Sequence, residues 1–244
     1  PQAPDVTRIG VIFRAEGGQY VVSLGGYTGD MTPTRNEDFV EYAKKLANPA
    51  IHEVLTQLIP VTDVKMYRVP RTTRRHYEKL AQMPGGVMVI GDAMCAFDPV
   101  FGQGMSVSAL EAEALATMLT VETPQSINTL NHRFHKRAAG IVNVPWMMGS
   151  TEDLRFKQTV GPRTPLMPII HWYSTQLFEL SATDQQVFET FYRVMHMLSG
   201  VPALLHPRIV FKVLRHAAFG DKPQQASPLD TQQTPLISVN DSQT

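Results

Sequence analysis

The stretch GDAMCAFDPVFGQGMS, residues 91–106, decides the fold, because an apolar run enters it and a helical pattern leaves it. The apolar run, Val87–Ile90, follows Pro84-Gly85-Gly86 and predicts a short strand covered on both faces. The residues that follow, from about Gln103 to Leu119, predict a helix. This order of strand, turn and helix is typical of α/β ligand sites, where ligands lie beyond the carboxyl ends of strands.

The side chains of this stretch favour a buried, anionic cofactor. Asp92 falls at the predicted end of the strand, where a carboxylate can accept hydrogen bonds from ribose or ribityl hydroxyls. Gly102 and Gly104 remove side-chain bulk where the helix begins, so the backbone can approach a ligand there. The free N–H groups and the positive dipole end of the helix favour negative charge. The pyrimidine edge of a reduced flavin fits these requirements.

The stretch resembles the second flavin fingerprint of the FAD-dependent aromatic hydroxylase and epoxidase superfamily, whose pattern is roughly G-D-A-A-H-x-x-x-P-x-x-G-Q-G-x-N-x-x-x-E-D-A-x-x-L-A. The chain departs from this pattern at three places. Cys95 replaces the His, Ser106 replaces the Asn, and Leu110-Glu111 replaces Glu-Asp. The positions that match in register are Gly91, Asp92, Ala93, Pro99, Gly102, Gln103, Gly104, Ala112, Leu115 and Ala116.

The resemblance implies FAD as cofactor and NAD(P)H as reductant. Asp92 would then bind the ribityl chain, and the backbone from Pro99 to Met105 would border the pyrimidine ring. Such enzymes use the reduced flavin and oxygen to hydroxylate or epoxidise a small apolar or aromatic molecule, and no acid-base side chain is required for epoxidation. The implied cofactor-binding set is Gly91, Asp92, Ala93, Pro99, Gly102, Gln103, Gly104 and Met105, and the catalytic residues are unknown.

Two alternatives stay open. Flavin-dependent double-bond reductases of the geranylgeranyl-reductase type share a related fingerprint. The second alternative is a non-catalytic fragment or subunit that retains the fold. Its support is that the chain has no G-x-G-x-x-G turn to hold the ADP half of FAD. The nearest candidates, Gly17-Gly18 and Gly25-Gly26, fall between β-like runs, where hairpin turns or bulges are expected.

The missing glycine motif, together with a strand pattern that begins within ten residues of Pro1, predicts the C-terminal portion of a longer protein. The expected fold is α+β, an incomplete FAD-monooxygenase fold that lacks its N-terminal Rossmann βαβ unit and is inactive alone. Its expected segments are the rest of a substrate-domain sheet with helices (1–83), the flavin-binding strand-turn-helix (84–140), a helical cap (141–220) and a disordered tail (221–244).

Residue periodicity predicts the remaining elements. The runs 8–13 and 19–24 predict an antiparallel hairpin within a larger sheet, and 64–69 predicts a further strand. Polar side chains at strand ends make Tyr27, Tyr67 and Arg68 candidates to orient the substrate. Arg75 or His76, in a basic cluster just before the flavin segment, could contact a cofactor phosphate or the reductant. Helices are predicted at 36–46, near 52–58, and at 126–137, 165–180, 184–198 and 207–219.

Composition narrows the class of function. The chain has 22 basic and 22 acidic residues, so no broad positive field favours nucleic acid. The single cysteine, Cys95, is expected to be a small buried hydrophobe and fits a reducing, cytoplasmic compartment. The pairs His132/His135 and His206/His216 lack zinc-ligand spacing and are expected at the surface. The basic amphipathic stretch 207–219 allows peripheral contact with a membrane. Composition does not define the oligomeric state.

Overall fold

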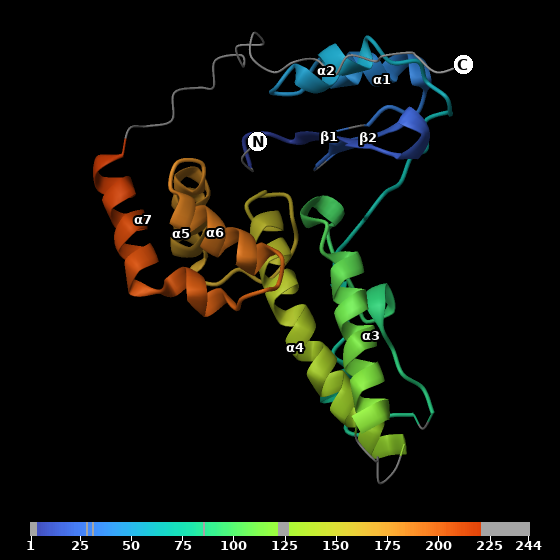
Figure 1. Ribbon diagram of the computed structural model, residues 1–244, viewed down its shortest axis with the longest axis vertical. Coiled ribbons are helices and arrows are strands. Elements are labelled where there is room, and N and C mark those ends of the chain that lie inside the picture. Colours follow the sequence, from blue (N-terminus) through green and yellow to red (C-terminus); the bar gives the residue numbers. More distant parts are fainter. Residues whose placement is uncertain (1–3, 28, 31, 85, 122–126, 221–244) are drawn as a thin grey trace. The chain divides into compact units, whose positions relative to one another are not determined.

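The computed structural model describes residues 4–27, 29–30, 32–84, 86–121 and 127–220 (Figure 1). The described residues divide into two compact units, the first built from residues up to 66 together with 219–220, and the second from residues 67–218. Helices predominate and the described sheets are small and antiparallel, which confirms the α+β class in its general form. The finer division into four segments stays a prediction, and the tail from 221 lies outside the described residues.

The first unit contains the predicted hairpin. Strands β1 (Arg8–Arg14) and β2 (Tyr20–Gly26) pair antiparallel, with Arg8 opposite Gly26 and Arg14 opposite Tyr20. Gly17 and Gly18 form the turn at φ +67° and +72°, a conformation that glycine adopts without strain. Two short helices follow, α1 (Asn36–Ala43) and α2 (Ala50–Leu55), so the second helix begins and ends earlier than predicted.

Gly25 and Gly26 lie within β2 instead of forming a turn or bulge, so that part of the prediction was wrong. The reason is a close approach of the backbone. A Cβ atom at Gly26 would lie 2.4 Å from the carbonyl oxygen of Asp30 and 2.7 Å from the hydroxyl of Tyr42. Asp30 also holds Arg8 through two hydrogen bonds of 2.7 and 3.0 Å, which fixes the chain after β2 against the start of β1.

The second unit is mostly helical. A two-residue strand β3 (Thr73–Arg74) pairs with β4 (Cys95–Ala96), and two long helices follow, α3 (Gly104–Val121) and α4 (Ile127–Asp153), which pack side by side (Figure 1). The helical C-terminal region comprises α5 (Met167–Ser181), α6 (Gln185–Met195) and α7 (Pro207–Phe219). Among the described residues, no helix combines the length and the apolar character needed to cross a membrane.

Two clusters of buried side chains stabilise the second unit. The first lies between α3, α4 and the 94–95 segment: Met94, Cys95, Val107, Met118, Leu130, Phe134, Ala138, Ala139 and Val142. The second joins α5, α6 and α7: Leu177, Val187, Val194, Leu204, Ile209 and Val213. Burial of the apolar faces of these helices supplies most of their stability, because isolated helices of this length are marginal in water.

Three sequence predictions differ from the structure in this unit. Neither 64–69 nor 87–90 forms a strand, because no other described strand lies beside them to complete a ladder. Val87 and Ile90 are 51% and 42% exposed, so the expected burial on both faces is wrong for the described chain. The helix predicted at 126–137 continues to Asp153 and includes Pro145, a residue that usually ends or bends a helix.

Candidate functional site

The predicted flavin segment begins with a single 3-10 turn, Gly91–Ala93. Gly91 has φ +62°, in the left-handed region, and a Cβ atom there would lie 3.1 Å from Oγ of Ser108 on α3. Its backbone N–H donates a 2.6 Å hydrogen bond to Oε2 of Glu111, also on α3. The turn therefore needs glycine and is anchored directly to the helix that follows it.

The segment before the turn is held by α4. Asn131 donates from Nδ2 to the carbonyl of Pro84 at 3.0 Å, and the backbone N–H of Val89 donates to Nε2 of His135 at 3.2 Å. Because Nε2 accepts, His135 carries its proton on Nδ1, which lies 2.8 Å from the carbonyl of Asn131 and donates to it. Both side chains are buried. Together with Glu111 they bond the backbone of Pro84, Val89 and Gly91 to helices α3 and α4.

The Asp92 side chain lies at the open side of this turn. It is exposed and makes no hydrogen bond to the described residues, while a Cβ atom at Gly104 would lie 4.0 Å from its Oδ1. The carboxylate is therefore next to the first turn of α3, where backbone N–H groups have no intrahelical acceptor. Asp92 and the helix end together form one polar surface that can both accept and donate hydrogen bonds.

The loop between β4 and α3 leaves backbone accessible. Asp98 accepts a 3.0 Å hydrogen bond from the N–H of Val100 and starts a 3-10 turn, Pro99–Phe101. Gly102 follows at φ +63°, with no atom within 4 Å of a Cβ built there. Gln103 is buried, and its Nε2 donates to the carbonyl of Met195 on α6 at 2.7 Å. The Gln103 side chain is thus occupied within the protein, and its backbone is what remains for a ligand.

Burial sets the protonation of two groups under the turn. It raises the pKa of the Glu111 carboxyl, whose Oε1 has no hydrogen-bond partner among the described residues, while the bond from Gly91 acts in the opposite direction. Burial also raises the pKa of the Cys95 thiol to about 12. Cys95 is therefore an unreactive, buried thiol, which confirms the prediction of a small hydrophobe.

One residue of the basic cluster reaches the turn. Arg75 donates from Nη1 to the carbonyl of Ala93 at 3.0 Å, directly beside Asp92. Arg74 is turned inward, where it donates to Oδ1 of Asn143 at 2.7 Å. His76 instead lies 2.7 Å from a carboxylate oxygen of Glu78. Arg75 is thus the cation of this cluster that the structure places at the turn.

A pair of carboxyl groups joins the loop to the end of α4. Asp153 is hydrogen-bonded to Asp98, the residue that starts the 99–101 turn. Burial first, then this hydrogen bond and the charges of Asp98 and Glu152, raise the pKa of the Asp153 carboxyl to about 7. Near neutral pH the Asp153 carboxyl therefore still holds its proton in part, as a buried carboxyl next to a second carboxyl group does.

The raised pKa of Asp153 predicts that stability falls as pH rises from about 4 to about 7. Asp153 keeps its proton up to about pH 7 when folded, whereas an unfolded aspartate loses it near pH 4. Protonation therefore stabilises the fold at low pH, and this contribution disappears as pH rises through the folded pKa. Between about pH 5 and pH 8 we expect the free energy of unfolding to fall by about 1 kcal/mol more in the native protein than in Asp153→Asn, after allowing for solvent screening.

Urea unfolding at several pH values measures this difference. The exposed residue Asp5 supplies the control, because Asp5→Asn should leave the pH dependence of the native protein unchanged. If the free energy of unfolding of the native protein and of Asp153→Asn changed with pH in parallel, the raised pKa of Asp153 would be contradicted.

The predicted substrate residues belong to different units of the chain. Tyr27 belongs to the first unit, whereas Tyr67 and Arg68 lie at the start of the second. Tyr67 and Arg68 are exposed in an irregular segment and do not lie at a strand end, because 64–69 forms no strand. Their joint role in orienting a substrate stays a prediction.

The anchoring residues Glu111, Asn131 and His135 were not predicted as part of the site. The expectation that His135 lies at the surface was wrong, whereas His132 is exposed. One sequence pattern could have identified Glu111 as buried. It is a polar residue on the apolar face of a helix, with Val107 four residues before it and Ala114 three residues after it. In the described part of the chain, no group of three or more His, Cys, Asp or Glu side chains is placed to hold a metal ion.

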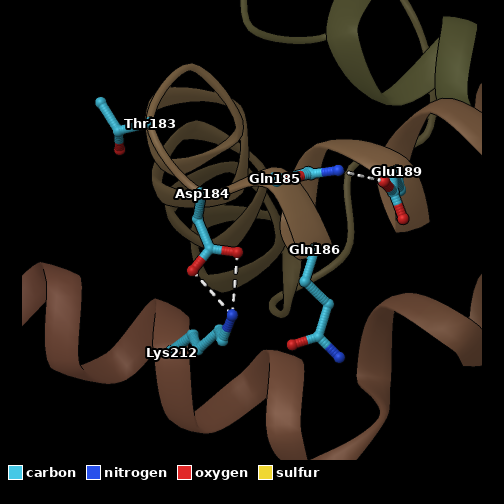
Figure 2. Close-up of a pocket in the computed structure, with 6 residues that line it drawn as sticks. All are labelled: Thr183, Asp184, Gln185, Gln186, Glu189 and Lys212. Carbon is cyan, nitrogen blue, oxygen red and sulfur yellow. Dashed lines mark hydrogen bonds and ion pairs between the residues drawn. The ribbon is translucent and has the colours of Figure 1, made fainter.

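An open polar hollow lies elsewhere in the second unit, lined by Thr183, Asp184, Gln185, Gln186, Glu189 and Lys212 (Figure 2). Its charged groups are already paired. Lys212 Nζ lies 2.8 and 2.7 Å from the two carboxylate oxygens of Asp184. Asp184 also accepts a hydrogen bond from the N–H of Val187 and so caps α6. None of the residues 91–105 lines this hollow. Because its charged groups pair with each other and cap α6, we interpret the hollow as a structural feature and not as a ligand site.

Comparison with known proteins gives one distant relationship. The chain is 23% identical over 229 residues to the protein Rv3254 of Mycobacterium tuberculosis. The match covers 90% of this chain and 47% of the relative, so the chain spans about half the length of the protein that it matches. No family model matches the chain.

Proposed function

We propose that this chain is the C-terminal portion of an FAD-dependent, NAD(P)H-linked monooxygenase that hydroxylates or epoxidises a small apolar or aromatic molecule. The observation that carries the proposal is the exposed Asp92 carboxylate, which lies beside the first turn of α3 with no hydrogen bond to the described residues. A carboxylate that is held next to a helix N-terminus by buried anchors, and is left without a partner, is suited to bind a ligand.

The residues of the turn fit the ribityl and pyrimidine side of a flavin. Asp92 would accept hydrogen bonds from ribityl hydroxyls, and the first N–H groups of α3 would stabilise negative charge at the pyrimidine edge. Gly102 and Gly104 have no other atom closer than 4.0 Å to a built Cβ, so the backbone between Pro99 and Met105 can contact a flat ring. When bound, FAD would supply the redox chemistry. The protein would orient the flavin, donate hydrogen bonds to it and exclude water.

The exposed apolar segment before the turn supports the incomplete FAD-monooxygenase fold. Val87 and Ile90 form no strand and are open to solvent in a chain that spans about half of its relative. We infer that strands from the other half of the whole protein cover this segment, and that this half binds the ADP portion of FAD. The chain alone would then lack part of the cofactor site and would be inactive.

An apolar or aromatic substrate agrees with the exposed face of α6. Phe188 and Tyr192 stack with ring centroids 5.5 Å apart, and both side chains are exposed. The last turn of the same helix is bonded to Gln103, so these rings belong to an element that is tied to the proposed flavin turn. Stacked aromatic rings of this kind provide surface for a flat, apolar molecule.

FAD binding tests the proposal, measured by flavin fluorescence and absorbance on this chain and on the longer natural protein. We expect only the longer protein to bind FAD. Asp92→Ala should weaken binding about tenfold or more, because it removes charge-assisted hydrogen bonds. Glu113→Ala, which removes an exposed carboxylate further along α3, should leave the affinity unchanged.

Failure of the longer protein to bind FAD would favour the non-catalytic alternative. If FAD binds, oxygen consumption that depends on NAD(P)H and on added substrate would separate a monooxygenase from a double-bond reductase.

A further inference from the structure

Helix α7 buries only one of its two apolar faces. Ile209 and Val213 are buried against the cluster formed with Leu177 and Val194, and this inner face explains why the helix packs against α5 and α6. A soluble helix that packs in this way normally carries polar residues on its opposite face.

The opposite face of α7 is apolar. Phe211 is 65% exposed and Leu214 is 51% exposed, and Ala218 continues the same row one turn later. These positions are three, four and seven residues apart and therefore lie on one side of the helix. Core packing accounts for the inner face and leaves this outer row unexplained.

The ionisable side chains on α7 are all basic. Lys212 is paired with Asp184 at 2.7 Å, and His216 lies 3.8 Å from a carboxylate oxygen of Glu179, so both face neighbouring helices. Arg208 and Arg215 are exposed and have no ion-pair partner among the described residues. The helix itself contains no Asp or Glu. Its outer surface thus combines an apolar row with two uncompensated guanidinium groups.

We propose that the outer face of α7, formed by Arg208, Phe211, Leu214, Arg215 and Ala218, binds the surface of an anionic lipid bilayer. The helix would lie in the plane of the interface, with Phe211 and Leu214 among the acyl chains and the two arginines on lipid phosphates. This combination of large apolar and basic residues on one helix face is what interfacial helices use. Anionic headgroups supply the negative charge that the protein does not.

A second copy of the chain fits this surface less well. Pairing through the same face around a twofold axis would bring Arg208 and Arg215 of each copy close to those of the other, which is unfavourable without acidic residues on the helix. The charge pattern therefore favours lipid over self-association.

Vesicle co-sedimentation of the full chain tests this proposal. We expect the protein to sediment with vesicles of phosphatidylcholine and phosphatidylserine, and not with phosphatidylcholine alone. Phe211→Ser should lower the partition coefficient about tenfold or more, because it removes a large buried apolar side chain from the bound state. Replacing both Arg208 and Arg215 by Gln should lower it about tenfold.

The control is Phe13→Ser, which changes a phenylalanine of similar exposure, 59%, in β1 of the other unit. It should leave partitioning unchanged, and far-ultraviolet circular dichroism should show that all variants are folded. The proposal is overturned if the native chain does not sediment with anionic vesicles, if Phe211→Ser binds as well as the native chain, or if Phe211→Ser instead dissociates a dimer seen by analytical ultracentrifugation.

Discussion

Phe134→Ala is expected to lower the free energy of unfolding of the second unit by about 3–5 kcal/mol. Phe134 is fully buried in the cluster between α3 and α4 and packs edge-on against His135, with ring centroids 5.3 Å apart. Its removal leaves a cavity between α3, α4 and the 94–95 segment. These three elements cannot all move inward to fill the cavity. The ring also fixes His135, so the substitution weakens the support of the proposed flavin turn.

Urea unfolding followed by circular dichroism measures this loss. Phe188→Ala is the matched control, because Phe188 is a half-exposed aromatic residue on α6, and its removal should cost far less. A loss for Phe134→Ala no larger than for Phe188→Ala would mean that the cluster between α3 and α4 does not determine the stability of the unit.

Glu111→Ala is expected to cost about 2–4 kcal/mol, because it leaves a cavity and an unpaired backbone N–H at Gly91. Glu111→Gln should cost much less, since an amide oxygen can still accept this hydrogen bond and no charge is buried. The comparison separates the role of the hydrogen bond from the role of the carboxyl charge.

The same urea series checks this prediction, with Glu113→Ala as the control on the exposed side of α3. In the longer protein, Glu111→Ala should also weaken FAD binding without contacting FAD, and Glu111→Gln should restore it. Equal losses for the Ala and Gln variants would show that Glu111 does not act by holding the N–H of Gly91.

The hairpin and most helices could be predicted because their signals are local. Runs rich in β-branched residues on both sides of Gly17-Gly18 define the hairpin, and apolar spacing of three and four residues defines α3, α5, α6 and α7. The prediction ended the helix at Arg137, whereas α4 continues to Asp153 and passes through Pro145, a residue that usually breaks a helix, because buried contacts on both sides of Pro145 keep the helix continuous.

The elements that depend on distant parts of the chain could not be predicted. A strand at 87–90 requires neighbouring strands, and the local apolar run does not reveal whether they are present. The hydrogen bonds from Asn131 to Pro84 and from Val89 to His135, and the pairing of Asp98 with Asp153, each join residues far apart in sequence. The pattern placed Asp92 at the end of an element, but it gave no information on what holds Asp92 there.

The buried anchors under the turn make ligand binding and helix packing parts of one equilibrium. The three anchors can release the backbone of Pro84, Val89 and Gly91 only when α3 and α4 loosen, so the ordered turn and the packed helix pair form a single cooperative unit. A molecule that binds the ordered turn must then raise the stability of the whole unit by thermodynamic linkage. By the same reciprocity, changes deep between the two helices alter the affinity for a molecule that they never touch.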